Sequence, residues 1–285
     1  MKSETQSSNV LERIWQSLSE EEANIIIAIA FASHPVSIDT LGVLSGASAV
    51  SILNVTDLLK KKKLVYENKD LPRGNYFVNG TDIESFLLNH VSAENLQPII
   101  VKAIDFYDRN LKPGNQKTLK IASLYHKFGP HKKSYEVIRK AAKLLLSDNQ
   151  REKAVIYFDY LIEHLGGETL TDTNVNIILD GLFGKFKATT HLIPIQKQLS
   201  LLNQAEKIAK DFQKWKYLTS IELELGKLLQ GAGQHEKAYR HMEDFWKLAA
   251  HIGDPHMLKM ATLLTSDYTH WKGKFKEAVR RYEEV

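Results

Sequence analysis

The feature that most constrains the fold is a segment that recurs forty residues further along the chain. Gly233-Gln234-His235-Glu236-Lys237-Ala238 matches Gly273-Lys274-Phe275-Lys276-Glu277-Ala278. In each copy a glycine stands at a turn, where it tolerates a positive φ. The alanine that follows lets a neighbouring helix approach closely, and larger apolar residues one turn apart form a buried stripe. We therefore expect pairs of helices that stack on one another as repeats.

The helical pattern extends over the whole chain from residue 94 onward, with no convincing strand. Leu225-Gly226 precedes the first copy of the repeat, but Thr265-Ser266 takes that place in the second, so we expect looser packing there. A weaker copy begins at Glu152-Lys153-Ala154. Helices are expected over 94–110, 116–128, 131–147, 150–165, 171–188, 192–211, 213–231, 235–252, 255–271 and from 274 onward.

The first 92 residues have a different pattern, three helices followed by a hairpin. Ser19 and Glu22 form a capping box at the start of one helix, and Ser37 and Ser48 begin two more. The chain then changes to the short β-like runs 64–67 and 75–78, separated by turn-forming residues. This layout is that of a winged helix, with a further helix over 81–90. We expect a mostly α protein with a winged-helix-like domain at 1–92 and tetratricopeptide-like repeats at 93–285.

Composition excludes several classes of protein. With no cysteine, the chain has no disulfide scaffold, no thiol nucleophile and no thiolate metal site. The longest apolar run, 24–32, is far shorter than the roughly 20 residues that a membrane span needs. The N-terminus lacks the layout of a signal peptide. We expect a cytoplasmic protein without a membrane partner.

The order of these segments carries a resemblance to known families. Leu225-Gly226, Gly233 and Ala238, followed by Gly273 and Ala278, resemble the tetratricopeptide pattern in a longer form of about 40 residues. A winged helix, then Ile121-Ala122-Ser123-Leu124-Tyr125-His126-Lys127-Phe128-Gly129, then paired helices resembles one larger class. It is the region that follows the nucleotide-binding domain in STAND-class signal-transduction ATPases of the maltose-regulon activator type.

This resemblance implies a segment of a multidomain signalling or transcription regulator. In that class the winged helix packs on the ATPase core, and the repeats receive a small inducer or a partner protein. The chain itself has no Gly-x-x-x-x-Gly-Lys-Ser/Thr loop, so the ATPase is missing. The chain stops at Val285 inside the second helix of a repeat, where a solenoid would normally add a polar cap. We expect a fragment of a longer protein.

No enzyme, cofactor or metal site is expected. His235 and His241 are six residues apart, which turns a helix by about 240°, so they cannot share a face as zinc ligands on one helix do. Gly181 and Gly184 are three apart in an apolar helix, and close helix packing explains them better than a phosphate loop.

The repeats predict a partner-binding surface instead. Stacked hairpins form a concave face that is lined by the first helix of each pair. In the best-defined pairs this places Lys227, Gln230, Asp267 and His270 on the groove. Such charged and amide groups suit a protein or peptide partner. Ordinary solvated helix faces are an equally good explanation.

DNA binding through the winged helix is the alternative function. Its residues would be Lys60, Lys61, Lys62, Lys63, Lys69 and Arg73. The lysine run also has a plain explanation, because cations at a helix C-terminus complement the helix dipole. Residues 1–95 hold 8 Lys and Arg against 12 Asp and Glu, a net charge of −4, which disfavours contact with phosphates.

Overall fold

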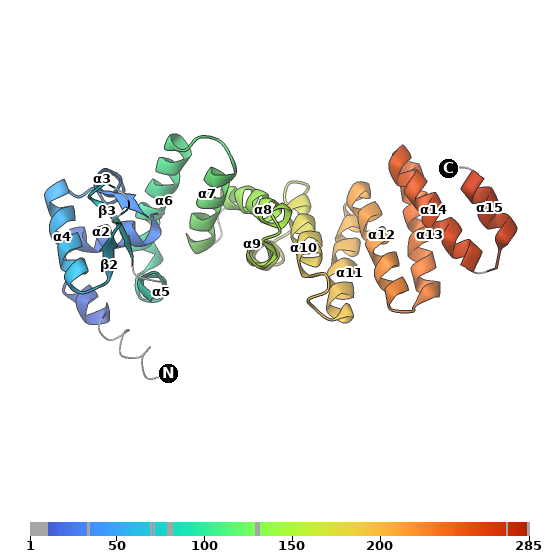
Figure 1. Ribbon diagram of the computed structural model, residues 1–285, viewed down its shortest axis with the longest axis horizontal. Coiled ribbons are helices and arrows are strands. Elements are labelled where there is room, and N and C mark those ends of the chain that lie inside the picture. Colours follow the sequence, from blue (N-terminus) through green and yellow to red (C-terminus); the bar gives the residue numbers. More distant parts are fainter. Residues whose placement is uncertain are drawn as a thin grey trace. The chain divides into compact units, whose positions relative to one another are not determined.

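The computed structural model is almost entirely helical (Figure 1). It describes residues 11–32, 35–68, 70, 72–78, 82–128, 132–271 and 273–283. Contacts divide the chain into two compact units, Met1–Ile138 and Arg139–Val285, and each is described by itself. The expected fold class, a mostly α chain with a small sheet followed by a helical-hairpin solenoid, is confirmed.

The first unit has the expected order of helices and hairpin. Its elements are α2 (Glu20–Phe31), β1 (Val36–Ser37), α3 (Ile38–Ser45), α4 (Ala49–Lys61), β2 (Val65–Glu67), β3 (Asn75–Val78), α5 (Asp82–His90), α6 (Ala93–Asn110) and α7 (Asn115–Phe128). The capping box is present, because the Ser19 side chain accepts from the Glu22 amide while the Glu22 carboxylate accepts from the Ser19 amide. Ser37 and Ser48 cap α3 and α4, and each side chain accepts from the amide three residues later.

The sheet has three strands where the sequence indicated two. β1 pairs antiparallel with β3, with Val36 opposite Tyr76, and the strand order is β1-β3-β2. A two-residue strand carries no periodic signal, so only its pairing with β3 reveals it. The sheet and helices share one core, to which α2 contributes Ile25, Ile29 and Phe31.

That core extends past residue 92. Ile99, Ile100 and Ala103 of α6 and Leu124 of α7 belong to the same cluster of buried residues as α2. A domain boundary at 92 therefore stays a prediction about where the winged-helix-like fold ends, while the compact unit continues to residue 138.

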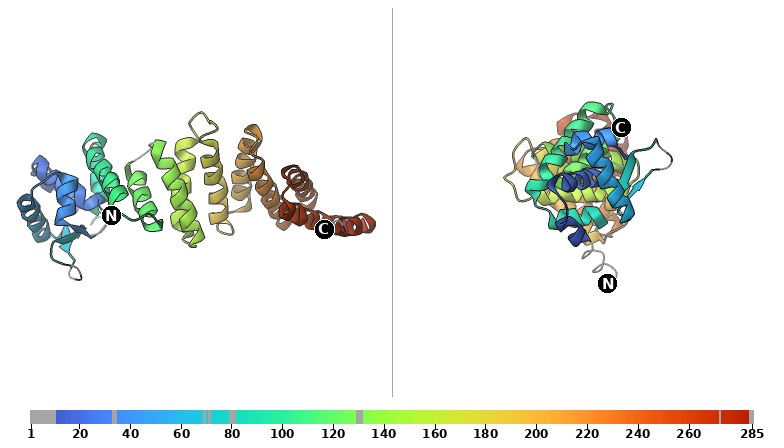
Figure 2. Two further views of the ribbon diagram at one scale, coloured as in Figure 1. Left: turned by 90° about the horizontal axis from the view of Figure 1, so that it is seen from above. Right: turned by 90° about the vertical axis from the view of Figure 1, so that its left-hand side faces the viewer.

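The second unit is a series of antiparallel helices (Figure 2). After the last part of α8 (Lys132–Ser147) come α9 (Arg151–Leu165), α10 (Val175–Thr189), α11 (Ile195–Asp211), α12 (Trp215–Gly231), α13 (His235–Ile252), α14 (Pro255–Trp271) and α15 (Phe275–Glu283). Consecutive helices pack against each other from α9 to α15. α10 begins four residues later than expected, since the Asn174 side chain accepts from the Thr171 amide and forms a turn there.

The glycines and alanines of the forty-residue repeat have the backbone conformation and the burial that their spacing predicted. Gly233 and Gly273 have φ values of 73° and 76° at equivalent turns, and Ala238 and Ala278 are buried. Gly226 makes room for Met242, since a Cβ there would lie 2.7 Å from Met242 Cε. Thr265 and Ser266 are fully buried. Their hydroxyls donate to backbone carbonyls of their own helix, so the burial leaves no hydroxyl without an acceptor. These hydroxyls therefore do not keep α14 away from its neighbours.

Within the described residues, no single helix has the length and apolar composition needed to cross a membrane. The bent pair of α3 and α4 passes that test by length and composition alone. Its apolar residues Leu41, Leu44, Ile52 and Leu59 are fully buried in the core of the first unit.

Candidate functional site

A groove of about 610 Å³ lies between the last helices of the second unit. We call it the hairpin groove, and its described lining is Gln230, His235, Ala238, Met242, Leu264, Asp267, Tyr268, His270 and Phe275. Apolar side chains such as Met242 and Tyr268 are buried, whereas Gln230 and His270 are exposed. The groove therefore combines an apolar floor with a polar rim, as ligand-binding pockets do.

The forty-residue repeat positions the residues of this groove. The turn at Gly233 separates Gln230 at the end of α12 from His235 at the start of α13. The turn at Gly273 separates His270 from Phe275 in the same way. His235 and Phe275 are thus equivalent positions of two repeats, and both line the hairpin groove.

Contacts within the groove hold several of its side chains in place. The Tyr282 hydroxyl donates to Asp267 Oδ1, and this bond raises the pKa of Tyr282. The ring of Tyr239 stacks on Tyr268 with 4.3 Å between centroids. The His270 ring meets Phe275 edge-on at 5.1 Å. These contacts reduce the side-chain entropy that a partner would otherwise have to remove on binding.

Three of the four residues predicted for the groove line it, namely Gln230, Asp267 and His270. Lys227 is exposed on α12 but is not among the described lining residues, and its Nζ lies 3.6 Å from Glu224 Oε1. Sequence reasoning missed Met242 and Phe275. The match of Phe275 with His235 at the repeat spacing was the signal that could have identified it. That any of these residues binds a partner stays a prediction.

Of the basic residues proposed to contact DNA, Lys60 is paired with carboxylates of its own unit. Lys60 Nζ lies 2.8 Å from Asp57 Oδ1 and 3.5 Å from Glu67 Oε2. The hydrogen bond with Asp57 raises the pKa of Lys60 and lowers that of Asp57. Lys61, Lys62, Lys63 and Arg73 are exposed, and Lys69 lies outside the described residues.

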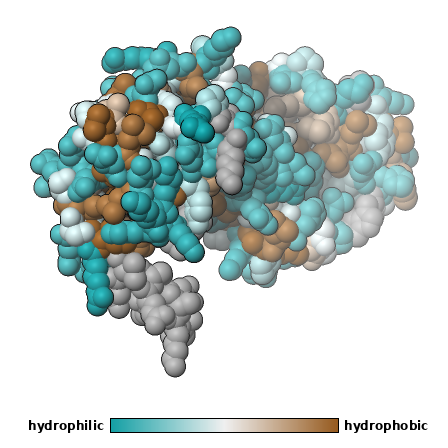
Figure 3. All heavy atoms as spheres, turned by 60° about the vertical axis from the view of Figure 1, so that its left-hand side comes forward, coloured by the Kyte–Doolittle hydropathy of each residue, from teal (hydrophilic) through white to brown (hydrophobic). Residues whose placement is uncertain are grey.

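The face of α4 that a winged helix would present to DNA carries apolar side chains. Val50 is 68% exposed and Leu53 is 43% exposed, and Val43 of α3 is 57% exposed. Apolar patches also interrupt the hydrophilic surface of the first unit in Figure 3.

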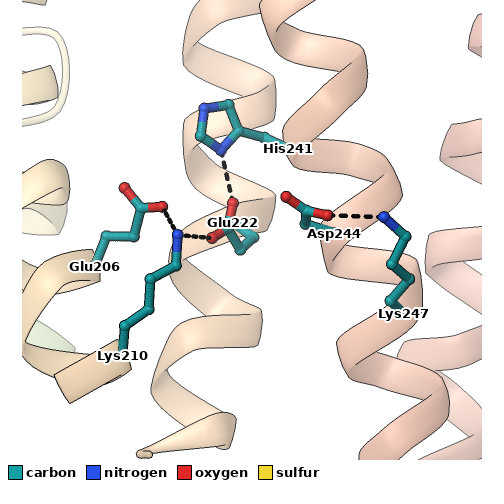
Figure 4. A network of polar contacts seen from close by, with 6 residues as sticks. All are labelled: Glu206, Lys210, Glu222, His241, Asp244 and Lys247. Atoms are coloured by element: carbon teal, nitrogen blue, oxygen red, sulfur yellow. Dashed lines mark hydrogen bonds and ion pairs between the residues drawn. The ribbon is translucent and has the colours of Figure 1, made fainter. Parts of the chain in front are cut away.

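A polar cluster in α11, α12 and α13 brings together groups that could hold a metal (Figure 4). One ligand atom each of Glu206, Glu222 and His241 lies within 4.8 Å of the others. Burial raises the pKa of Glu222, while its 2.6 Å hydrogen bond with His241 Nδ1 raises the pKa of the histidine. The spacing of histidines along α13 gave no sign of this cluster, because each side chain comes from a different helix.

Comparisons with known proteins return distant likenesses. No protein-family model matches the sequence, and no curated protein matches it. The solved apo form of RapI has a TM-score of 0.47 and 8% identity, covering 70% of this chain and 65% of that chain. A STAND protein with a tetratricopeptide repeat sensor, from Pyrococcus horikoshii, has a TM-score of 0.44 and 14% identity, covering 97% and 52%.

A third structure, of tetratricopeptide-like repeats of a kinesin light chain from Podospora anserina, has a TM-score of 0.44 and 12% identity. It covers 71% of this chain and 89% of that chain. For RapI and the STAND protein, the similar region spans less than two thirds of the length of the solved chain. With all three TM-scores below 0.5, we base the proposed function on this chain's own residues.

Proposed function

We propose that this chain is a non-catalytic interaction scaffold that binds a peptide or helical segment of a partner protein in the hairpin groove. The observation that carries the proposal is the groove itself, about 610 Å³ in volume, with Met242, Tyr268 and Phe275 beside Asp267 and His270. Apolar side chains would supply most of the binding energy, and the polar rim would set the orientation of the bound segment.

The whole protein would be a multidomain signalling or transcription regulator, in which this chain senses a partner or a small inducer.

The first unit would act as a winged helix that docks on protein rather than on DNA. Val43, Val50 and Leu53 support this assignment, since exposed apolar side chains favour a protein surface over phosphates. Unchanged mobility of duplex DNA at low salt is the expected result, and salt-dependent retardation would contradict it.

The groove is tested by selecting peptides from a random library with the full chain and measuring their affinity by calorimetry. Phe275→Ala and Asp267→Ala should each weaken a selected peptide by about tenfold, the loss expected for a contact in the centre of an interface. Leu263→Ala is the matched control, because Leu263 is 39% exposed on α14 but does not line the groove. Peptides whose affinity is the same for all three variants would refute the proposal.

A non-catalytic role has its own test. The full chain should not hydrolyse ATP, since its sequence holds no phosphate-binding loop of the Gly-x-x-x-x-Gly-Lys-Ser/Thr type. Hydrolysis that copurifies with the chain and is lost in a variant of a described groove residue would contradict the scaffold assignment.

A further inference from the structure

A buried carboxylate lies where α11, α12 and α13 pack side by side, and neither it nor its partners are among the described residues that line the hairpin groove. Glu222 of α12 is 1% exposed. Its Oε2 lies 2.6 Å from His241 Nδ1, but the Lys210 ammonium is 3.7 Å from its Oε1, which is longer than a hydrogen bond. A carboxylate removed from water requires close compensation of its charge. A protonated His241 ring supplies that compensation at close range, whereas the Lys210 ammonium supplies it only at a distance.

Two further carboxylates lie near Glu222 and its partners. Glu206 of α11 places a second carboxylate on the Lys210 ammonium, one helical turn away. Asp244 lies near enough to help raise the pKa values of both Lys210 and His241, and its own partner is Lys247 at 3.1 Å. The side chain of Lys210 is 53% exposed, and its ammonium lies between the carboxylates of Glu206 and Glu222 (Figure 4).

The donor atoms of the cluster are close to the spacing of a metal site. Ligand atoms of Glu206, Glu222 and His241 all lie within 4.8 Å of one another. Bonds of about 2.0–2.2 Å to zinc put neighbouring ligand atoms roughly 3–3.5 Å apart. The side chains of Glu206 and His241 are 18% and 25% exposed, so their ends can move over this short distance while Glu222 stays in place.

We propose that Glu206, Glu222 and His241 bind one divalent transition-metal ion of the Zn²⁺ class, and that the Lys210 ammonium occupies the position that the metal takes. An imidazole with two carboxylates selects such ions over Mg²⁺ and Ca²⁺, which prefer oxygen ligands alone. The ion would join three consecutive helices of the solenoid. Withdrawal of Lys210 would open the path by which the ion enters.

Calorimetric titration of the full chain with Zn²⁺ tests the proposal, and the absorption spectrum with Co²⁺ reports the coordination. We expect one ion per chain, and a loss of affinity of at least about tenfold in His241→Ala and in Glu206→Gln. His256→Ala is the matched control, because this exposed histidine of α14 lies outside the cluster. Equal Zn²⁺ affinity in wild type, His241→Ala and Glu206→Gln would overturn the proposal and assign the ion to surface histidines.

Lys210→Met separates a metal site from a simple network of ion pairs. It removes the competing ammonium from a half-exposed position, so the chain should stay folded by circular dichroism and bind Zn²⁺ about tenfold more tightly. If Lys210 were the proper partner of both carboxylates, the variant would bind Zn²⁺ no better than wild type. That result, or no binding of Zn²⁺ to either protein, would overturn the proposal even if the ligand variants failed to fold.

Discussion

The ring of Phe158 in α9 occupies the space that a side chain on Gly184 of α10 would need. A Cβ at Gly184 would lie 2.3 Å from Phe158 Cζ, and Phe158 itself is only 1% exposed. The two glycines of α10 were expected to allow close helix packing, and this contact shows it at Gly184. At Gly181 a Cβ would lie 3.3 Å from Ile162 Cγ1, so the fit there is less tight.

Gly184→Ala should therefore destabilise the second unit. The clash with this buried ring costs about 3 kcal/mol, the upper end of the range for an overpacked core, while alanine recovers about 1 kcal/mol of helix propensity, so we expect a net loss of about 2 kcal/mol. Urea denaturation followed by circular dichroism measures it. Gly231→Ala is the control, because a Cβ there meets nothing within 4 Å and should be neutral or slightly stabilising. A neutral Gly184→Ala would contradict the packing.

Asp180 joins three other side chains in the second unit, and its removal should also be costly. Its Oδ2 lies 3.2 Å from Arg139 Nη1 and 2.5 Å from Lys143 Nζ, and its Oδ1 accepts from the Tyr217 hydroxyl at 2.9 Å. Asp180→Ala should lose about 1–3 kcal/mol in the free energy of unfolding, since the Tyr217 hydroxyl and the Arg139 guanidinium lose a charged acceptor.

Two substitutions serve as references for Asp180→Ala in the same denaturation experiment. Asp180→Asn keeps an acceptor for the Tyr217 hydroxyl, so its loss should be smaller. Lys143 has a side chain that is 52% exposed, and Lys143→Met should change stability by at most about 1 kcal/mol. Equal losses for Asp180→Ala and Lys143→Met would mean that the exposed ion pair alone matters.

Glu67 should make the hairpin of the first unit sensitive to acid. The Gly74 amide donates to Glu67 Oε1 at 2.9 Å, and this bond, assisted by Lys60, lowers the pKa of Glu67. A carboxylate whose pKa is lower in the folded state stabilises the fold above its unfolded pKa of about 4.3. That contribution is lost as the pH falls through the lower, folded pKa.

The Gly74 amide resonance reports this titration directly by NMR. Its midpoint should lie below about pH 4.3, the ordinary value for a glutamate. Glu67→Gln keeps an oxygen acceptor but cannot ionise, so the amide shift should then be flat over the same range. A wild-type midpoint at or above the ordinary value would refute the assigned hydrogen bond.

Neighbouring apolar residues of α4 should differ sharply in their contribution to stability. Ile52 is fully buried, and Ile52→Ala should destabilise the first unit by about 2–5 kcal/mol. Leu53 is 43% exposed, so Leu53→Ala should change stability by no more than about 0.5 kcal/mol. Urea titrations followed through the amide signals of α2 to α4 measure both. A large loss in Leu53→Ala would mean that its side chain is buried within this unit.

Helix bounds, the capping box at Ser19 and the rhythm of the repeats could be predicted from sequence because each depends on neighbours a few residues apart. The periodicity of α12 and α14 also sufficed to place Gln230, Asp267 and His270 on the faces that line the groove. Lys227 is the forty-residue equivalent of Asp267, yet it is not among the described residues that line the groove. Local periodicity defines a helix face but not how far along it a groove extends.

The contacts that carry chemistry were decided only by the tertiary structure. Glu206, Glu222 and His241 stand on three helices, and no spacing along the chain relates them. The pairing of β1 with β3 and the partners of Asp180 are likewise contacts between distant segments. Sequence determines which helices form and which faces are apolar, because those depend on backbone and side-chain properties along one segment. The packing angle and offset between helices depend on how all the buried side chains fit together, and they decide which polar groups meet.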